Sequence, residues 1–204
     1  MIIRKLFKFE GAHIVRNCYT SKCKYNLHGH SFKVEVFLEG NALDRAGMLC
    51  DFSVLKNEVK DFIESFDHSY FFWNKESEEL QSFIKGNFKR WISLPVSPSA
   101  ENLSIIFYWF ITKIINNTGF ANGEGQIKVK AVRVHETDTG YAEASYEDLK
   151  LFPEHIIDDD LKGKTSKNFV FSPSIMEDWK NNQILNNLHY AIPFVVEEPE
   201  QQIE

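Results

Sequence analysis

Apolar and polar residues alternate in two segments near the start of the sequence. Residues 2–14 carry Phe9 and His13 at positions of the same parity. In residues 28–39, one parity is apolar apart from two histidines, and it comprises His28, His30, Phe32, Val34, Val36 and Leu38. A period of two residues is typical of a strand buried on one side, so we expect two strands here.

Apolar residues at helical spacing follow these strands. They predict a helix of about four turns over residues 51–66 and a second helix over 101–115. Between the two helices, residues 70–98 form an insert. Its apolar residues from Leu80 to Ile92 recur at helical spacing, which predicts a further helix that ends before Pro95.

Two more strands are expected at residues 126–136 and 140–147, joined by a turn at Thr137–Gly140. Strand pairs on either side of a run of helices predict an α+β domain, a four-stranded antiparallel sheet with helices on one face. A sheet of four strands has two open edges, which are a liability unless they are covered or paired between subunits. We therefore expect a homo-oligomer.

The negative charge of the chain is concentrated towards its end. Residues 1–152 contain 19 basic and 19 acidic side chains, whereas residues 153–204 contain 4 and 10, which accounts for the net charge of −6. A neutral body is not the basic surface that nucleic acid requires. We expect one domain over residues 1–150 and an acidic C-terminal extension over 151–204 that is solvated or faces a partner.

Composition narrows the class of protein further. Hydrophobic residues make up 43% of the 204 residues, including 18 Phe, which is enough for a sizeable core. The sequence has no stretch of the ~20 apolar residues that a membrane helix needs, and its start lacks the apolar run of a signal peptide. We therefore expect a cytoplasmic protein with no membrane partner. Three cysteines argue against a disulfide framework.

The histidines form a candidate metal site. A strand places His28 and His30 on one face, roughly 6.5–7 Å apart. If the first two strands pair as a hairpin, His13 lies beside both. Three neutral imidazoles with an open fourth position are typical of catalytic zinc sites. The alternative is that His13 is a core residue and that His28 and His30 are ordinary surface residues at the start of a strand.

Two cysteines lie in a loop that also contains cations. Cys18 and Cys23 are close in sequence to Arg16, Lys22 and Lys24. Nearby cations lower the pKa of a thiol and raise its thiolate fraction. Cys23 is nearer to the histidines in sequence and is the better candidate nucleophile or base, although Cys18 could substitute. Cys23 could instead be a fourth, thiolate ligand that closes a structural metal site.

Six ordered motifs go further than these spacings. They are FEGAHIV (9–15), KCKYN (22–26), LHGHSF (27–32), FDHSY (66–70), SPSAENL (97–103) and VHETDTGY (134–141). Their order resembles that in the 6-pyruvoyl-tetrahydropterin synthase family, which includes the bacterial 6-carboxytetrahydropterin synthases of queuosine biosynthesis. The resemblance covers about residues 1–147 without the insert, and LHGHSF is more similar to the bacterial branch.

The resemblance implies the tunnelling fold (T-fold), in which sheets from several subunits join into a barrel. It also implies a trimer or hexamer with active sites at subunit interfaces. In such a protein His13, His28 and His30 would hold Zn²⁺.

The resemblance implies further roles at matching positions. Cys23 takes the position of the catalytic cysteine, and Asp67 with His68 matches a catalytic Asp–His pair. Glu136 matches the glutamate that anchors the pterin. Ser99 and Glu101 belong to a stretch that supports pterin binding.

The resemblance implies a zinc-dependent lyase, a 6-carboxy-5,6,7,8-tetrahydropterin synthase. Its substrate would be 7,8-dihydroneopterin triphosphate, and triphosphate and acetaldehyde would be lost. Two alternatives stay open. One is a 6-pyruvoyl-tetrahydropterin synthase, which only eliminates triphosphate, and the other is a non-catalytic zinc- or pterin-binding assembly protein. Arg16, Lys22 and Lys24 are candidate triphosphate partners, or else ordinary solvated cations.

Overall fold

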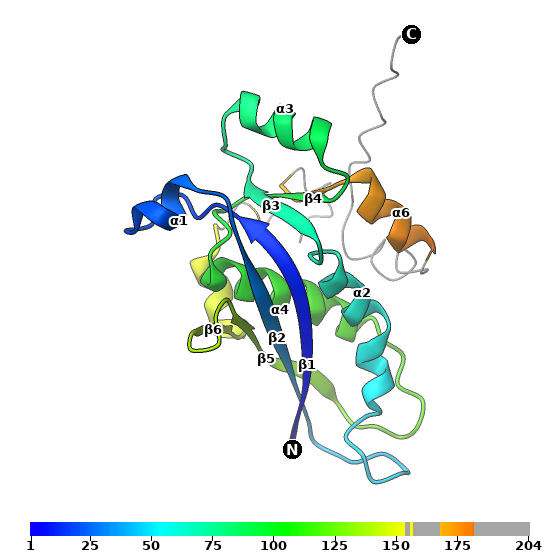
Figure 1. The fold of residues 1–204 in the computed structure, drawn as a ribbon. Coiled ribbons are helices and arrows are strands. Elements are labelled where there is room, and N and C mark those ends of the chain that lie inside the picture. Colours follow the sequence, from blue (N-terminus) through cyan, green and yellow to red (C-terminus); the bar gives the residue numbers. More distant parts are fainter. Residues whose placement is uncertain (154–155, 157–167, 182–204) are drawn as a thin grey trace.

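Seven strands form one mixed sheet in the computed structural model, counted over the residues that it describes, 1–153, 156 and 168–181 (Figure 1). Their order in the sheet is β6-β5-β2-β1-β3-β4-β7. The strands are β1 Ile2–His13, β2 His28–Gly40, β3 Ser69–Trp73, β4 Trp91–Leu94, β5 Ile127–His135, β6 Tyr141–Ala144 and β7 Val170–Phe171. The α-helices are α1 Ser21–Tyr25, α2 Glu58–Glu64, α3 Glu78–Asn87, α4 Ala100–Asn116 and α6 Pro173–Asn181, and the 3₁₀ helices are η1 Phe52–Lys56 and η2 Tyr146–Leu151.

The four predicted strands are confirmed, and they are antiparallel neighbours. β1 pairs with β2 along its whole length, β2 pairs with β5, and β5 pairs with β6. Each strand alternates buried and more exposed residues, which is why its period of two was visible in the sequence.

The prediction of a four-stranded, fully antiparallel sheet is incomplete. β3 pairs in parallel with the end of β1, from Gly11 to His13, β4 pairs in parallel with β3, and β7 pairs antiparallel with β4. β3 and β4 lie in the insert, where Tyr70–Phe72 and Trp91–Leu94 are almost continuously buried. A strand covered on both faces has no polar side, so its sequence shows no alternation.

The predicted helix in the insert is also only partly correct. α3 begins after its N-cap Ser77, whose hydroxyl accepts a hydrogen bond from the amide of Leu80 (3.2 Å), and it ends at Asn87. Trp91 and Ile92, which we had assigned to the same helix, belong to β4. Short apolar runs carry too little periodic information to separate a buried strand from a helix.

The helix expected at residues 51–66 is divided in two. Asp51 caps the 3₁₀ turn η1 by accepting a hydrogen bond from the amide of Ser53 (2.7 Å). Asn57 then interrupts the helical backbone before α2 begins at Glu58.

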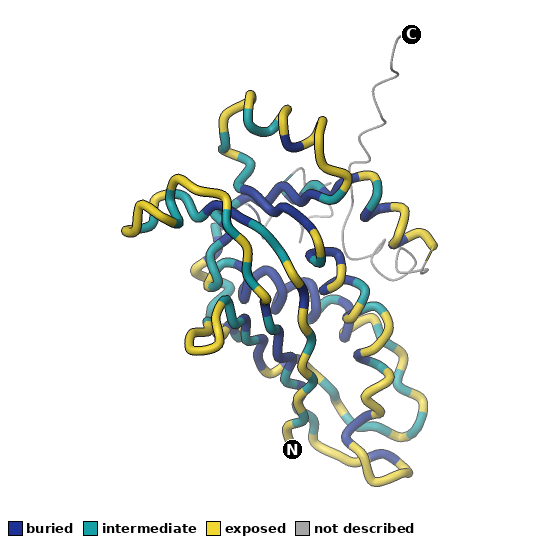
Figure 2. Tube along the Cα trace, viewed as in Figure 1, coloured by how far each residue is buried: buried dark blue, intermediate teal, exposed yellow. Residues whose placement is uncertain are grey.

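Helices α2 and α4 cover one face of the sheet and enclose the main core (Figure 2). Their aromatic side chains pack directly: the rings of Phe62 and Phe110 stack at 4.7 Å, and those of Phe66 and Phe107 meet edge-on at 4.7 Å. Helix α3 packs on the opposite face of β3 and β4, where Ile84 joins a second cluster. The expectation of helices on one face therefore holds only for the antiparallel part of the sheet.

The other face of the antiparallel part is polar. Glu35 is buried there and accepts hydrogen bonds from Arg4 and His135, the latter at 2.7 Å. Burial raises the pKa of Glu35, but the hydrogen bonds from His135 and Arg4 outweigh burial, so its pKa is lowered overall. The carboxylate is therefore ionised at neutral pH.

Residues 168–181 belong to the same core, although the sequence placed them in an extension. β7 pairs with β4, and α6 buries Ile175 and Trp179. The indole of Trp179 donates a hydrogen bond to the hydroxyl of Ser65 (2.6 Å) at the end of α2. Within the predicted extension, the residues that follow Asn181 at the end of α6 lie outside the described part of the chain. None of the described helices has the length and apolarity to span a membrane.

The burial of Trp179 in α6 predicts how much the protein is destabilised when this side chain is shortened. Trp179→Ala removes a side chain that is 1% exposed and should lower the free energy of unfolding by about 3–5 kcal/mol. Lys180→Ala, at the exposed neighbouring position, should change it by about 0.5 kcal/mol or less. Urea denaturation of both variants checks this, and equal unfolding midpoints would show that α6 is not part of the core.

Candidate metal centre and its surroundings

The register of β1 and β2 brings the three predicted histidines together. His13 lies directly opposite His28, and His30 lies opposite Gly11, two residues further along. The imidazole centroids are 4.6 Å apart for His13 and His28, 5.3 Å for His13 and His30, and 5.0 Å for His28 and His30. The alternative, in which these histidines are unrelated core and surface residues, does not fit this geometry.

Backbone carbonyls set the tautomers of two of these rings. Nδ1 of His13 lies 2.8 Å from the carbonyl oxygen of Pro98, and Nδ1 of His28 lies 3.0 Å from that of Asn26. A carbonyl oxygen can only accept, so Nδ1 carries the proton and Nε2 keeps a free lone pair. This is how metal-ligating histidines are usually oriented by their outer partners.

The Nε2 atoms of His13, His28 and His30 are buried without a hydrogen-bond partner among the described residues. Buried polar atoms are normally satisfied, so three unsatisfied lone pairs at one point require an explanation. Burial lowers the pKa of His30, which keeps that ring neutral and able to ligate. The donor set therefore fits a metal ion.

Glu136 completes this cluster. It directly follows β5, and its Oε1 lies 3.1 Å from Nε2 of His13 and 3.7 Å from Nε2 of His30. The ligand atoms of the four side chains lie within 4.8 Å of one another, so together they could hold a metal ion. The adjacent imidazole of His13 lowers the pKa of Glu136, so this carboxylate is ionised at neutral pH.

The sequence had suggested a pterin-binding role for Glu136 and did not place it beside the imidazoles. The position of Glu136 could nevertheless have been predicted, because Glu136 follows the strand that pairs with β2. His135 lies opposite Lys33, three residues beyond His30. A correct pairing of the predicted strands would have brought Glu136 towards the histidines.

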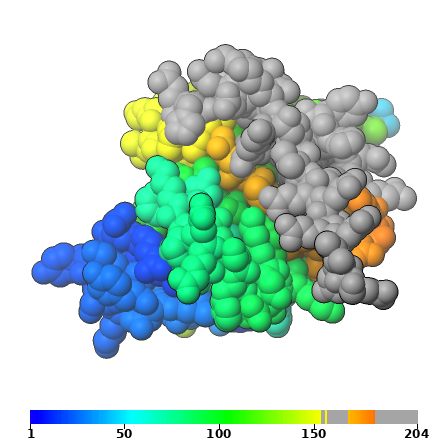
Figure 3. Space-filling view, turned by 90° about the horizontal axis from the view of Figure 1, so that it is seen from above, coloured from blue at the N-terminus to red at the C-terminus, as the bar shows by residue number. Residues whose placement is uncertain are grey.

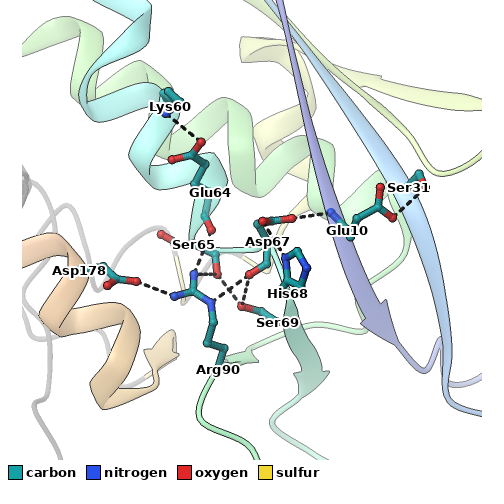
Figure 4. Close-up of polar contacts among 10 residues, drawn as sticks. All are labelled: Glu10, Ser31, Lys60, Glu64, Ser65, Asp67, His68, Ser69, Arg90 and Asp178. Carbon is teal, nitrogen blue, oxygen red and sulfur yellow. Dashed lines mark hydrogen bonds and ion pairs between the residues drawn. The ribbon is translucent and has the colours of Figure 1, made fainter.

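The predicted Asp67–His68 pair is formed within one turn between α2 and β3 (Figure 4). Oδ2 of Asp67 lies 2.8 Å from Nδ1 of His68, and Oδ1 of Asp67 accepts a hydrogen bond from the amide of Glu10 (2.8 Å). The side chain of His68 is 75% exposed, so its other nitrogen is open to solvent or a ligand.

One cavity of about 720 Å³ connects the two groups, because both His30 and His68 line it. The end of α3 at Asn87 and the connection to β4 at Phe88 and Lys89 also line this cavity. Tyr70 also lines the cavity, but burial raises the pKa of its phenol to about 12. Tyr70 is therefore protonated at neutral pH and is not a base.

Cys23 lies in the short helix α1, which projects to one side of the molecule in the view of Figure 3. The carbonyl of Cys23 accepts a hydrogen bond from the amide of Val15 (3.1 Å), two residues beyond His13. Cys23 and Cys18 are both half-buried, and the thiol of Cys18 donates to the carbonyl of Thr20 (3.3 Å).

Arg16 is engaged in a different contact from the one suggested by the sequence. It donates to both carboxylate oxygens of Glu76 (2.8 and 2.9 Å) and to the carbonyl of Lys24 (2.9 Å). The hydrogen bonds to Glu76 raise the pKa of Arg16. Arg16 thus ties the segment that carries Cys23 to the insert, and its guanidinium is already paired.

The start of α4 lies beside the histidine cluster, because the neighbouring Pro98 contacts His13. Ser99 is the N-cap of α4 and accepts a hydrogen bond from the amide of Asn102 (3.4 Å). Glu101 lies in the first turn and is exposed. Of these two predicted substrate-binding residues, the side chain of Ser99 thus has a capping role, whereas that of Glu101 faces solvent.

Comparison with known proteins agrees with the motifs. The family described as 6-pyruvoyl tetrahydropterin synthase matches residues 2–147. A protein of Helicobacter pylori strain J99 named 6-carboxy-5,6,7,8-tetrahydropterin synthase is 47% identical over 150 residues, 74% of this chain and 75% of that protein. One of the same name from Aquifex aeolicus is 30% identical over 160 residues, 69% of this chain and 95% of that protein.

Solved structures share the fold. An uncharacterized protein from Wolinella succinogenes superimposes with a TM-score of 0.56 at 20% identity, covering 72% of this chain and 98% of that one. The 6-pyruvoyltetrahydropterin synthase of Plasmodium vivax gives 0.50 at 21% identity, covering 71% and 97%. The α+β fold is therefore the T-fold, and the chain belongs to the 6-pyruvoyl tetrahydropterin synthase family.

Proposed function

We propose that the protein is a zinc-dependent 6-carboxy-5,6,7,8-tetrahydropterin synthase, a lyase of queuosine biosynthesis. It would convert 7,8-dihydroneopterin triphosphate with loss of triphosphate and acetaldehyde. The observation that carries this proposal is the convergence of three unsatisfied Nε2 atoms on one point beside a cavity. The 47% identity to a protein that bears this name supports the choice within the family.

His13, His28 and His30 are the proposed zinc ligands, with Glu136 next to them. Imidazole nitrogens are well suited to zinc. Magnesium and calcium prefer sites made only of oxygen ligands, which these residues do not form. Bound zinc supplies Lewis acidity, which makes neighbouring hydroxyl and C–H groups of a chelating side chain more acidic.

Cys23 is the proposed base, with Cys18 as the other candidate. Asp67 accepts the hydrogen bond from Nδ1–H of His68 and fixes the orientation of that ring, so Nε2 of His68 can exchange a proton with a ligand in the cavity. Proton transfer by positioned groups of this kind typically contributes 10²–10⁴-fold in rate.

Glu101 and Glu136 are proposed to share the recognition of the pterin. A pterin ring presents adjacent N–H donors, and a carboxylate can accept two of them in parallel. Glu101 is the exposed carboxylate, at the start of the helix that contacts His13 through Pro98, whereas Glu136 lies against the imidazoles. Ser99 would act by holding the start of α4 in place.

We also propose that the enzyme is a homo-oligomer whose sheets join into a barrel, with a trimer or hexamer as the expected state. β1 pairs with β3 only from Gly11 to His13, so among the described residues no strand covers the same edge of β1 from Ile2 to Phe9. The outer edge of β6 is likewise open within the described chain. Two exposed edges on one sheet favour strand pairing between copies.

Metal content is the first prediction. The purified protein should bind one equivalent of zinc per chain, and His28→Ala should weaken binding by at least the roughly 10–100-fold that the loss of an outer-sphere partner costs. His68→Asn, which changes a histidine outside the cluster, should leave the metal content intact. Elemental analysis after dialysis against a chelator checks both variants, and equal zinc loss in the two would argue against the assigned ligands.

Turnover is the second prediction. With 7,8-dihydroneopterin triphosphate, mass spectrometry should detect 6-carboxytetrahydropterin together with acetaldehyde. Cys23→Ala should lower kcat by about 10²–10⁴-fold, as expected for loss of a base, while Cys18→Ala should leave kcat within about twofold. A product that retains the pyruvoyl side chain would favour the simple elimination, and unchanged turnover in Cys23→Ala would remove Cys23 from the mechanism.

The two glutamates give a third prediction. Glu101→Gln should raise KM or lower kcat with zinc content unchanged, because it removes a carboxylate that is exposed near the site. Glu136→Gln should weaken zinc binding as well, by about 10–100-fold, because its oxygen lies among the imidazole nitrogens. Competition with a chromogenic zinc chelator separates the variants, and the assignment fails if the chelator strips both at the same concentration.

A further inference from the structure

A single arginine holds the backbone of the turn that carries Asp67 and His68. Arg90 directly precedes β4, and its guanidinium reaches across to the end of α2 (Figure 4). Nε donates to the carbonyl of Asp67 (3.0 Å), and Nη2 donates to the carbonyls of Glu64 (3.0 Å) and Ser65 (3.4 Å). The last carbonyls of a helix have no partner within the helix, so a cation placed here satisfies them.

The turn needs such support because its backbone is unusual. His68 has a φ of 53°, in the left-handed region, which costs about 1–2 kcal/mol for a residue with a side chain. Conformations of this kind persist only where the surroundings fix them. The amide of His68 donates to the carbonyl of Glu10 (2.7 Å), which fixes the turn against β1.

Asp67 is therefore held from two sides. Its side chain accepts the amide hydrogen of Glu10 on one side, and its carbonyl accepts Nε–H of Arg90 on the other. These two contacts leave the remaining carboxylate oxygen directed at Nδ1 of His68. The hydroxyl of Ser69 also donates to the carbonyl of Asp67 (3.3 Å), so loss of Arg90 would leave this carbonyl with the longer of its two contacts.

The fourth contact of Arg90 comes from α6. Nη1 donates to Oδ2 of Asp178 in α6 (2.6 Å), beyond residues 2–147 that the family matches. Asp178 is 52% exposed, so the ion pair contributes little to stability by itself. The ion pair instead orients the guanidinium. Because the group is planar, holding Nη1 at Asp178 also fixes the directions of Nε and Nη2.

We propose that Arg90, braced by Asp178, is a positioning residue for Asp67 and His68, so that α6 sets the geometry of a pair located on another element. This inference rests on the proposed role of that pair in catalysis. His68 and His30 face the same cavity, so a shift of the turn would change where the imidazole meets a bound substrate. A displacement of about 1 Å can cost 10²-fold in rate.

Kinetics give the first test, on the full-length zinc-loaded enzyme. Arg90→Lys keeps the charge but lacks the planar fork, and it should lower kcat by at least about tenfold with KM and zinc content unchanged. Asp178→Asn should lower kcat severalfold. Ile111→Val trims a buried side chain of α4 and leaves Arg90 and α6 unchanged, so it reports any effect of general destabilisation. An equal fall of kcat in Ile111→Val and Arg90→Lys would overturn the proposal.

Added ethylguanidinium gives a matched rescue. It should restore part of kcat in Arg90→Ala, because it can occupy the vacated donor positions, and it should have no such effect on Ile111→Val. The proposal fails if ethylguanidinium leaves kcat of Arg90→Ala unchanged while that variant remains folded by circular dichroism.

Amide hydrogen exchange tests the brace without turnover. The amide of Glu10 donates to Asp67 in this turn, and the amide of His68 donates from the turn to the carbonyl of Glu10. Both amides should therefore exchange at least about tenfold faster in Arg90→Lys than in Ile111→Val. Unchanged exchange at these two amides overturns the brace. If the wild type lacks pterin turnover but the exchange changes as expected, the brace stands as structure and the proposed function fails. Faster exchange with unchanged kcat would contradict the positioning role.

Discussion

The antiparallel register between β1 and β2 is the constraint on which the rest of the structure depends. It places His13 opposite His28, and it also places Phe9 opposite Phe32, whose buried rings stack at 4.9 Å. The imidazoles and the two phenylalanines share one face of the sheet, so the packing that stabilises the core also fixes the geometry of the candidate metal site. A slip of one residue would move every one of these side chains to the opposite face. The candidate site is thus specified by hydrophobic burial before any metal binds.

Much of this arrangement was predictable because it depends on patterns within short stretches of the sequence. The period of two in residues 2–14 and 28–39 gave the hairpin, and the hairpin gave the histidine cluster. The motifs added Asp67 with His68, which form a hydrogen-bonded pair within one turn. Residues that are adjacent in sequence, or that the pairing of two strands brings together, can be placed without further knowledge of the fold.

What escaped prediction depends on contacts between distant segments or on burial from both sides. β3 and β4 are covered on both faces and so have no polar side, which is why Trp91 and Ile92 resembled a continuation of α3. The carbonyl that orients His13 comes from Pro98, 85 residues away. Arg90 was inconspicuous in the sequence, since its partners are mostly backbone carbonyls, and any residue type can supply those.

The cavity is lined partly by a central strand of the sheet and partly by an exposed connection, and these two parts differ in how well they tolerate substitution. His30 lies on the central strand β2, where substitution disturbs the core. Another part of the lining is the exposed end of α3 at Asn87 with the connection at Phe88 and Lys89. Surface connections of this type tolerate changes of length and composition far better than strands do. Exchange of a few residues between α3 and β4 can therefore alter which molecules the cavity admits while the histidine cluster stays in place.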